Sequence, residues 1–370
     1  MRKCAGLIQK SYRFKRRRIR FAFSHIKNLQ LHPSKVEAYI KAIEVYLPQQ
    51  TLENQELAER FPDWSAKKVF EKVGITRRHI AAFDETAGDM AAKSCSLLFE
   101  SGEIAKSDIG FLILCTQSPD YFLPTTACIL QDRLGLSTKC GAFDINLGCS
   151  GYIYGLAVSK GLIGAGCASN ILLVTSETYS KYIADDDKSN LSIFGDAACA
   201  TLISTNGLYK VANFAFGTDG SGASKLIVKK GASREPVLPR IHSALIPGSE
   251  TNPMSKPPFL EMDGPAVFNF TLASVPKLIE QTLIANAVTF DSVDMFIFHQ
   301  ANSLMLSTLK KVCKIPDDKF FVSMEDVGNT VSSTIPICLS RFQKMHGISG
   351  KTILLCGFGV GFSWGGCILQ

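Results

Sequence analysis

The segment AFDINLGCSGYIYGLAVSKGLIGAG, residues 142–166, carries the strongest indication of the fold class. It starts as a short strand, makes a glycine-containing turn and continues as an apolar stretch of helical length. Cys149 lies in the turn, where the helix begins. A thiol at a helix N-terminus feels the positive end of the helix dipole and unpaired N–H groups, and both favour the nucleophilic thiolate.

Gly148 and Gly151 flank this cysteine, and their lack of side chains would let a substrate approach the backbone closely. The alternative is that Cys149 is a small residue chosen for tight packing between strand and helix. The segment alone leaves both interpretations open.

Two segments share one pattern: DIGFLILCTQS (108–118) and DMFIFHQANS (294–303). Each has an acidic residue, an apolar strand and a polar exit that leads into a helix. The repetition predicts a duplicated α/β chain with a boundary near residue 208, which gives an N-terminal half over 36–207 and a C-terminal half over 208–370. Further strands are expected at 38–45, 140–145, 170–176 and within 194–204, and helices at 53–61, 66–72, 89–101, 125–134, 151–163, 268–286, 303–312 and 333–344.

The composition is that of a well-packed globular protein, with 370 residues, 46% hydrophobic and 20% charged. The net charge of +7 comes from residues 1–35, which hold eleven Lys and Arg and no acid. The remainder has 29 basic and 33 acidic residues. Bulk electrostatics therefore does not predict nucleic-acid binding by the body.

The basic extension over 1–35 is open to three interpretations. It could be an organelle transit peptide, a basic arm for nucleic acid or anionic membrane, or a disordered extension upstream of a true start near Val36. The third is preferred, because a strand pattern begins there.

Twelve cysteines are scattered without CxxC spacing or a Cys/His cluster, so no metal site is expected. Many unpaired thiols suit a reducing compartment, and the sequence predicts a cytoplasmic protein. The last nineteen residues, 352–370, are uncharged but contain five glycines. They predict two buried strands joined by a glycine turn, and no membrane span.

Three further features fall at the ends of predicted elements. His299 follows the strand MFIF, a place typical of a site residue in α/β proteins. Asn329 lies in EDVGNTVSSTIP, where a turn asparagine is the plain alternative. The loop GFGVGFSWGG (357–366) lacks a phosphate-binding lysine but could supply backbone N–H groups as an oxyanion hole. A cysteine, a histidine and an asparagine fit the general logic of an activated nucleophile.

These motifs, in this order and spacing, resemble β-ketoacyl-acyl-carrier-protein synthase III, a ketosynthase of the thiolase superfamily. The motifs are LGCSG around Cys149, FHQAN around His299, VGNTVSSTIP around Asn329 and the terminal GFGVGFSWGG. GITRRHIAAFDET (74–86) and SIFGDAACATLIS (192–204) are similar to the same family. The resemblance runs from residue 38 to 370.

The resemblance implies a duplicated thiolase-like fold in five layers, αβαβα, and a homodimer that works with acyl carrier protein. It implies no cofactor beyond the thioester substrates, acyl-coenzyme A or acyl-carrier protein and malonyl-carrier protein. By resemblance Cys149 holds the acyl group, while His299 and Asn329 bind the malonyl thioester carbonyl and stabilise the enolate formed as CO₂ leaves. The N–H groups of Cys149 and Val360 would bind the other oxyanion.

The chain departs from the family where coenzyme A would bind. Family members carry a Trp four residues before an Arg, and both hold the nucleotide; the aligned residues here are Lys68 and Lys72, and Trp64 lies outside that register. Lys188 replaces another family arginine. Lysine keeps the charge but loses planar stacking, which favours a carrier-protein donor over coenzyme A. Lys72 and Lys188 remain the expected substrate contacts.

Other implied contacts are less regular. Leu304 replaces the arginine expected for carrier docking, and Lys310 and Lys311 on the same helix could serve an acidic partner, or could form a solvated face. The partner-subunit loop that closes the acyl pocket would contain Phe122 and Leu123. Gly359, in the glycine loop, is the last expected substrate contact.

The preferred function is therefore a decarboxylating condensation of an acyl thioester with malonyl-acyl carrier protein. One alternative keeps the cysteine and fold but transfers the acyl group to an amine or hydroxyl without loss of CO₂. A second alternative is a silent protein that only binds acyl carrier protein, which the presence of Cys149 disfavours.

Overall fold

The computed structural model describes residues 37–236, 259–347 and 350–370. The predicted basic extension over 1–35 lies outside the described residues.

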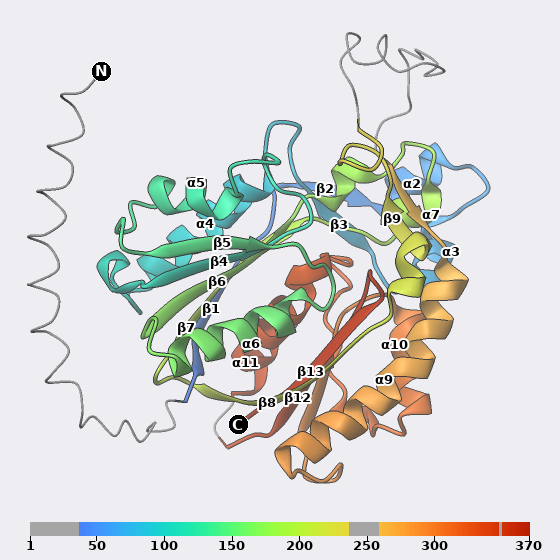
Figure 1. The fold of residues 1–370 in the computed structure, drawn as a ribbon. Coiled ribbons are helices and arrows are strands. Elements are labelled where there is room, and N and C mark those ends of the chain that lie inside the picture. The colour runs from blue at the N-terminus through green and yellow to red at the C-terminus, as the bar shows by residue number, and fades with distance from the viewer. Residues whose placement is uncertain (1–36, 237–258, 348–349) are drawn as a thin grey trace, which may run out of the picture. The chain divides into compact units, whose positions relative to one another are not determined.

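Within the described residues, nine strands hydrogen-bond into one sheet in the order β11-β12-β13-β8-β1-β7-β6-β4-β5 (Figure 1). They are β1 (Tyr39–Tyr46), β4 (Phe111–Cys115), β5 (Gly141–Ile145), β6 (Asn170–Glu177), β7 (Ala197–Ser204), β8 (Tyr209–Thr218), β11 (Met295–Phe298), β12 (Ile353–Gly359) and β13 (Ser363–Leu369). β4 runs parallel to β5 and β6, and β11 runs parallel to β12; the other neighbours are antiparallel. Two short pairs lie outside this sheet: β2 (Gln50–Glu53) with β3 (Arg77–Ile80), and β9 (Leu226–Val228) with β10 (Leu260–Met262).

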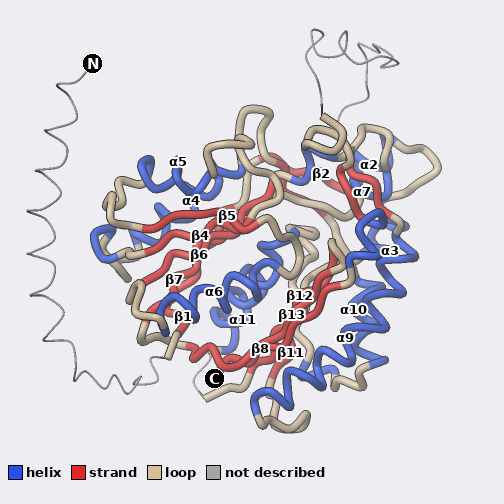
Figure 2. The backbone as a smooth tube through the Cα atoms, in the orientation of Figure 1, coloured by secondary structure: helices blue, strands red, loops and turns tan. Residues whose placement is uncertain are grey.

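The sheet has two parts joined by a narrow seam. Only Tyr39 with Lys210 and Ile40 with Tyr209 pair β1 to β8. One part contains β1 and β4 to β7, and the other contains β8 and β11 to β13. The seam lets the two parts lie on opposite sides of the same helices (Figure 2).

Helices cover both parts of the sheet. They are α2 (Asn54–Arg60), α3 (Ala66–Val73), α4 (Ala87–Glu100), α5 (Thr126–Arg133), α6 (Gly151–Gly164), α7 (Lys188–Leu191), α9 (Gly264–Asn286), α10 (Ser303–Val312) and α11 (Thr334–His346). α4 and α5 pack on the first part, and α9, with α10 beside it, packs on the second. α6 and α11 contact strands of both parts. The layers therefore run helix, sheet, helix, sheet, helix, and the expected duplicated thiolase-like αβαβα fold is confirmed.

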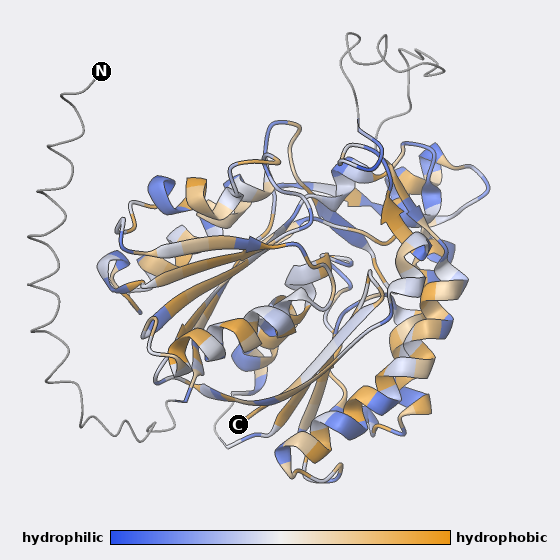
Figure 3. Ribbon diagram, viewed as in Figure 1, coloured by the Kyte–Doolittle hydropathy of each residue, from blue (hydrophilic) through white to orange (hydrophobic). Residues whose placement is uncertain are grey.

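The sequence of α6 explains its central place. Its residues are apolar on nearly every face, which is the pattern of a helix buried on both sides (Figure 3). Tyr152, Ile153 and Leu156 are fully buried in a cluster that also takes side chains from strands of both parts of the sheet. This central packing fixes the start of α6, and with it Cys149.

Most expected elements are confirmed, including the two buried terminal strands β12 and β13. β8 was not expected, because Asn213 and Gly217 interrupt its apolar pattern. The short helix α7 was not among the expected elements. The predicted boundary near residue 208 falls between β7 and β8, and the division into two domains stays a prediction. No helix in the described ranges is both long and apolar enough to cross a bilayer.

Replacing Leu156 with alanine should lower the free energy of unfolding by about 2–5 kcal/mol, because it leaves a cavity between the two parts of the sheet. Urea denaturation followed by circular dichroism measures this change. Leu208→Ala is the control, since Leu208 is 51% exposed. Equal effects of the two substitutions would contradict the central role of α6.

Candidate active site

Cys149 lies in the turn between β5 and α6, immediately before the helix cap Ser150. Its side chain is buried, with 6% of the residue exposed. The backbone N–H of Val360 and that of Cys149 itself both hydrogen-bond the sulfur. The two N–H groups expected to form an oxyanion hole therefore converge on this sulfur.

Burial raises the pKa of the Cys149 thiol to about 12, and the nearby Glu177 carboxyl adds to the rise, while the two N–H groups lower the pKa in part. The N–H groups favour the thiolate, as the sequence predicts for a helix N-terminus, but the cost of burying a charge exceeds the stabilisation that they provide. A reaction at this sulfur needs a group that takes the proton.

The glycines around Cys149 serve packing within the chain. A Cβ on Gly148 would lie 2.5 Å from Gln117 Oε1, and a Cβ on Gly151 would lie 2.2 Å from Cys115 Sγ. The expectation that these two glycines open the backbone to substrate is corrected: side chains of the protein already occupy the space. Gly359 is the glycine that faces Cys149, since its Cβ would lie 2.8 Å from Cys149 Sγ.

His299 follows β11 and is 3% exposed. Its Nδ1 lies 2.7 Å from Thr334 Oγ1, and the Thr334 hydroxyl donates to the Val331 carbonyl at 2.9 Å. This network assigns the proton to Nδ1, because the Thr334 hydrogen is already used, and leaves Nε2 as an acceptor. Burial lowers the pKa of His299 to about 3, so the ring is neutral near pH 7.

Hydrogen bonds of its backbone to neighbouring segments hold Asn329 in place. Its N–H donates to the Ile193 carbonyl at 2.9 Å, and its carbonyl accepts from Gly195 N–H at 3.0 Å. The side-chain Oδ1 accepts from Val331 N–H at 3.0 Å. The amide Nδ2 is therefore the part of the side chain that is left to donate to a ligand.

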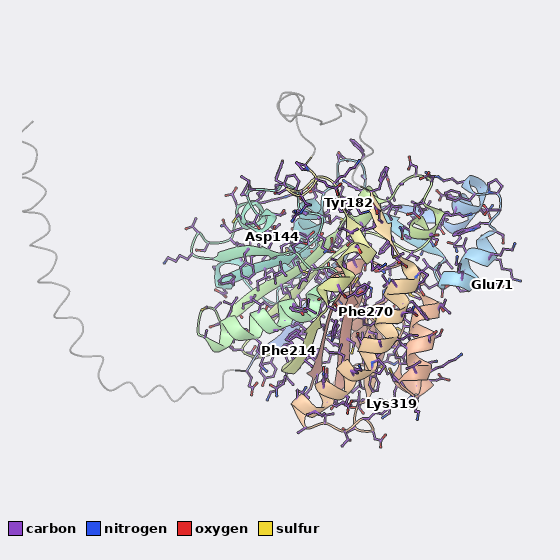
Figure 4. The ribbon with its side chains drawn as sticks, turned by 45° about the vertical axis from the view of Figure 1, so that its right-hand side comes forward. Glu71, Asp144, Tyr182, Phe214, Phe270 and Lys319 are labelled. Atoms are coloured by element: carbon purple, nitrogen blue, oxygen red, sulfur yellow. The ribbon has the colours of Figure 1, made fainter. Side chains whose placement is uncertain are left out.

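Cys149, His299 and Asn329 line one cavity of about 840 Å³, and Gly359 and Lys72 line it as well. The walls are mainly apolar and come from segments far apart in the sequence; Phe194, Met262, Phe268 and Met305 are examples. Figure 4 shows the surrounding elements with their side chains, with Tyr182 and Phe270 labelled. Large apolar walls with a few converging polar groups are typical of a ligand site.

The two expected nucleotide contacts meet at Trp64. The Nζ atoms of Lys72 and Lys188 each lie 5.4 Å from the centre of its ring, and Lys188 also pairs with Asp63. Lys72 lines the cavity, whereas Lys188 lies outside its lining. Sequence reasoning placed Trp64 outside the site, because its position in the loop before α3 gives no alignment with the motif.

The remaining predicted residues lie apart from the cavity. Phe122 and Leu123 are 81% and 83% exposed. Lys310 pairs with Asp317, while Lys311 is exposed. Within the described ranges no cluster of three or more His, Cys, Asp or Glu is placed to hold a metal ion.

Sequence reasoning missed the buried carboxyl of Glu177 near Cys149. The signal was an acidic residue at the end of the apolar strand NILLVTSE. It also missed Thr334, which holds the His299 ring.

Known proteins resemble the chain in sequence and in structure. The family model for 3-oxoacyl-[acyl-carrier-protein] synthase III matches residues 143–220, and the model for its C-terminal part matches residues 283–370. The chain is similar to beta-ketoacyl-[acyl-carrier-protein] synthase III of Methylococcus capsulatus, with 33% identity over 88% of this chain and 96% of the relative. The protein of the same name from Chlamydia caviae is 32% identical over 90% of this chain and 97% of the relative.

Solved structures agree with the sequence comparison. A crystal structure of a 3-oxoacyl-(acyl-carrier-protein) synthase III at 2.1 Å matches with a TM-score of 0.83 and 45% identity, over 90% of this chain and 99% of the other. The 3-oxoacyl-(acyl-carrier protein) synthase of Burkholderia xenovorans matches with a TM-score of 0.80 and 35% identity, over 90% and 93%.

Replacing Gly359 with alanine should slow alkylation of Cys149 by iodoacetamide about tenfold, because the new methyl group would press on the sulfur. Peptide mass spectrometry reports the rate at Cys149 alone. Gly220→Ala is the matched control, since nothing lies within 4 Å of its Cβ position. An unchanged rate in the Gly359 variant would contradict this packing.

Proposed function

Because the chain belongs to the β-ketoacyl-[acyl-carrier-protein] synthase III family, we propose that it is an acyltransferase that condenses an acyl thioester with malonyl-acyl carrier protein. The product is a β-ketoacyl-acyl carrier protein, in fatty acid or specialised acyl-chain biosynthesis. The observation that carries the proposal is the shared cavity of Cys149, His299 and Asn329. The reaction needs no metal or cofactor beyond the two thioesters, and the relatives favour it over acyl transfer to an amine or hydroxyl.

In the first half-reaction the sulfur of Cys149 attacks the thioester carbonyl and passes its proton to Nε2 of His299. The neutral ring with a free Nε2 supports this role. The N–H groups of Cys149 and Val360 bind the oxyanion that forms. The carrier thiol then leaves with the proton from His299, and the acyl group stays on Cys149.

In the second half-reaction the malonyl thioester carbonyl accepts hydrogen bonds from Asn329 Nδ2 and His299 Nε2. His299 must now donate from Nε2, so Nε2 takes a proton from solvent and Nδ1 gives its own proton up to solvent. The Thr334 hydroxyl then turns from the Val331 carbonyl and donates to the bare Nδ1. The bond to the carboxylate breaks, CO₂ leaves, and its electron pair forms an enolate. The enolate carbon attacks the acyl carbon, and Cys149 departs as thiolate and recovers a proton from solvent.

Lys72 and Lys188 support a carrier-protein donor over coenzyme A. Both ammonium groups lie against Trp64, and Lys188 is also held by Asp63. A lysine cannot stack on adenine as a guanidinium does. A phosphate on the arm by which a carrier protein holds its thioester would still be attracted by these two ammonium groups.

An acidic carrier protein would dock beside the cavity entrance. Leu304 is 58% exposed and lines the cavity, and Lys311 is exposed on the same helix α10. Lys310 contributes less, since Asp317 neutralises it. This arrangement combines an apolar contact with one available positive charge.

The enzyme is proposed to be a homodimer. β5 forms one edge of the nine-stranded sheet, and the unpaired backbone groups of an edge strand can pair with a strand of another chain. The loop with Phe122 and Leu123 is strongly exposed and apolar, as expected of residues that reach a partner's pocket. Two more apolar side chains are partly exposed: Val158 on α6, which is less exposed than Phe122 and Leu123, and Phe214, which is labelled in Figure 4 and is half-buried.

A cytoplasmic location is proposed because the eleven described cysteines are all free thiols.

A reaction of the protein with malonyl-acyl carrier protein and a panel of short acyl donors should yield a β-ketoacyl product and CO₂. The product is measured by mass spectrometry, with each donor supplied on coenzyme A and on carrier protein. Carrier-bound donors should react faster. The Cys149→Ala variant should give no acyl adduct and no product.

Two outcomes would argue against the proposal. An acyl adduct on Cys149 without CO₂ release would favour transfer to another acceptor. Equal rates with both carriers would remove the argument from the two lysines.

Light scattering coupled to gel filtration should give twice the chain mass of 40.3 kDa. Phe122→Asp places a charge in the proposed interface, and it should weaken the dimer and lower product formation together. Phe83→Asp is the control, since Phe83 is fully exposed but lies outside the proposed pocket loop. A monomeric, active wild-type protein would contradict the dimer.

A further inference from the structure

Glu177 is a fully buried carboxyl group at the end of β6, and the proposed mechanism does not use it. Its oxygens accept hydrogen bonds from Gln117 N–H at 3.0 and 3.2 Å, from the Ser118 hydroxyl at 3.0 Å and from the Ser332 hydroxyl at 3.0 Å. None of these donors is charged, and within the described residues Glu177 forms no ion pair. A buried carboxyl with this set of partners calls for a reason.

The hydrogen bonds join two separate parts of the site. Gln117 and Ser118 follow β4, and a Cβ on Gly148 would meet the Gln117 side chain. The segment with Gln117 therefore lies against the turn between β5 and α6 that carries Cys149, called the nucleophile turn below. Ser332 follows Asn329 and precedes the helix that carries Thr334. One carboxyl group therefore ties the Asn329 segment to the surroundings of Cys149.

The charge of Glu177 also bears on Cys149. Both groups are buried, and a negative carboxyl opposes formation of a thiolate nearby. The other titratable groups that face Glu177 are Asp196, Cys115, Tyr179 and Tyr182, each of which is neutral or negative. Two anions so placed without a cation cannot form together at modest cost.

We propose that Glu177 is a positioning residue: its carboxyl group holds Ser332, and so the Asn329 segment, against the nucleophile turn, and it must keep its proton while Cys149 becomes a thiolate. The first part rests on the proposed function, because it concerns the condensation step. The second part concerns the cysteine alone.

The proton is available near neutral pH. Burial raises the pKa of Glu177 to about 8, although its hydrogen-bond donors lower it in part. Glu177 is therefore mostly protonated at pH 7, where its O–H donates to one of the two serine hydroxyls instead of accepting from it, and it loses its proton above about pH 8. The thiolate population of Cys149 should then stop rising with pH, because the new carboxylate raises the pKa of the thiol.

The first measurement is the rate of Cys149 alkylation by iodoacetamide between pH 6 and 10 in the full-length protein, read by peptide mass spectrometry. The wild-type rate should flatten near pH 8. Glu177→Gln keeps the shape and removes the charge, so its rate should continue to rise and exceed the wild-type rate about threefold or more at pH 9. Superimposable curves for the two folded proteins would overturn the coupling.

The second measurement compares two adjacent serines. Ser332→Ala removes the tie to Glu177, whereas Ser333→Ala removes a hydroxyl that contacts Thr175 and the Ala197 carbonyl instead. Ser332→Ala should lower the rate of condensation about tenfold with little change in acylation of Cys149, and Ser333→Ala should leave both near wild type. Equal effects of the two variants, or an equal loss in both half-reactions, would overturn the positioning role.

The two measurements separate the possible failures. A wild-type protein that forms no β-ketoacyl product would contradict the proposed function, while the alkylation curves would still decide whether Glu177 and Cys149 are coupled. If Glu177→Gln does not fold, as circular dichroism would show, the pair of serine variants decides the proposal.

Discussion

The turn that carries Cys149 lies directly on two glycines of β12, and the rest of the site depends on this contact. A Cβ on Gly357 would lie 2.8 Å from the Cys149 carbonyl, and one on Gly359 would lie 2.8 Å from its sulfur. Any side chain there would push α6 away from the second part of the sheet. The close approach also brings Val360 N–H to the sulfur, so one packing contact sets both the position of Cys149 and one of its hydrogen-bond donors.

Burial sets the chemistry of the site. The same desolvation keeps the Cys149 thiol protonated, the His299 ring neutral and the Glu177 carboxyl largely uncharged near pH 7. Charge therefore appears only when a proton moves between these groups or when substrate arrives. A pocket without fixed charge beside the nucleophile suits a reaction in which a carboxylate departs as neutral CO₂.

The lining of the cavity combines a positive charge with mainly apolar walls. Lys72 lines the cavity and, like Lys188 outside it, lies against the Trp64 ring. A thioester carried on a phosphate-bearing arm fits this combination of charged and apolar lining, since its charged end stays in water and its acyl end reaches the buried sulfur. The exposed apolar side chains of Phe122 and Leu123 lie away from this cavity, which is why a second chain is part of the proposed enzyme.

The strand–turn–helix around Cys149, the polar exits of the repeated strands and the buried terminal strands could be predicted from the sequence, because they follow from local patterns of apolar residues and glycines. The motifs also indicated the family. The direction of the Cys149 pKa shift, the contacts of Trp64 with two lysines and the hydrogen bonds of Glu177 became visible in the folded chain alone. Burial and long-range contacts set these properties, and neither can be predicted from the residues that are adjacent along the chain.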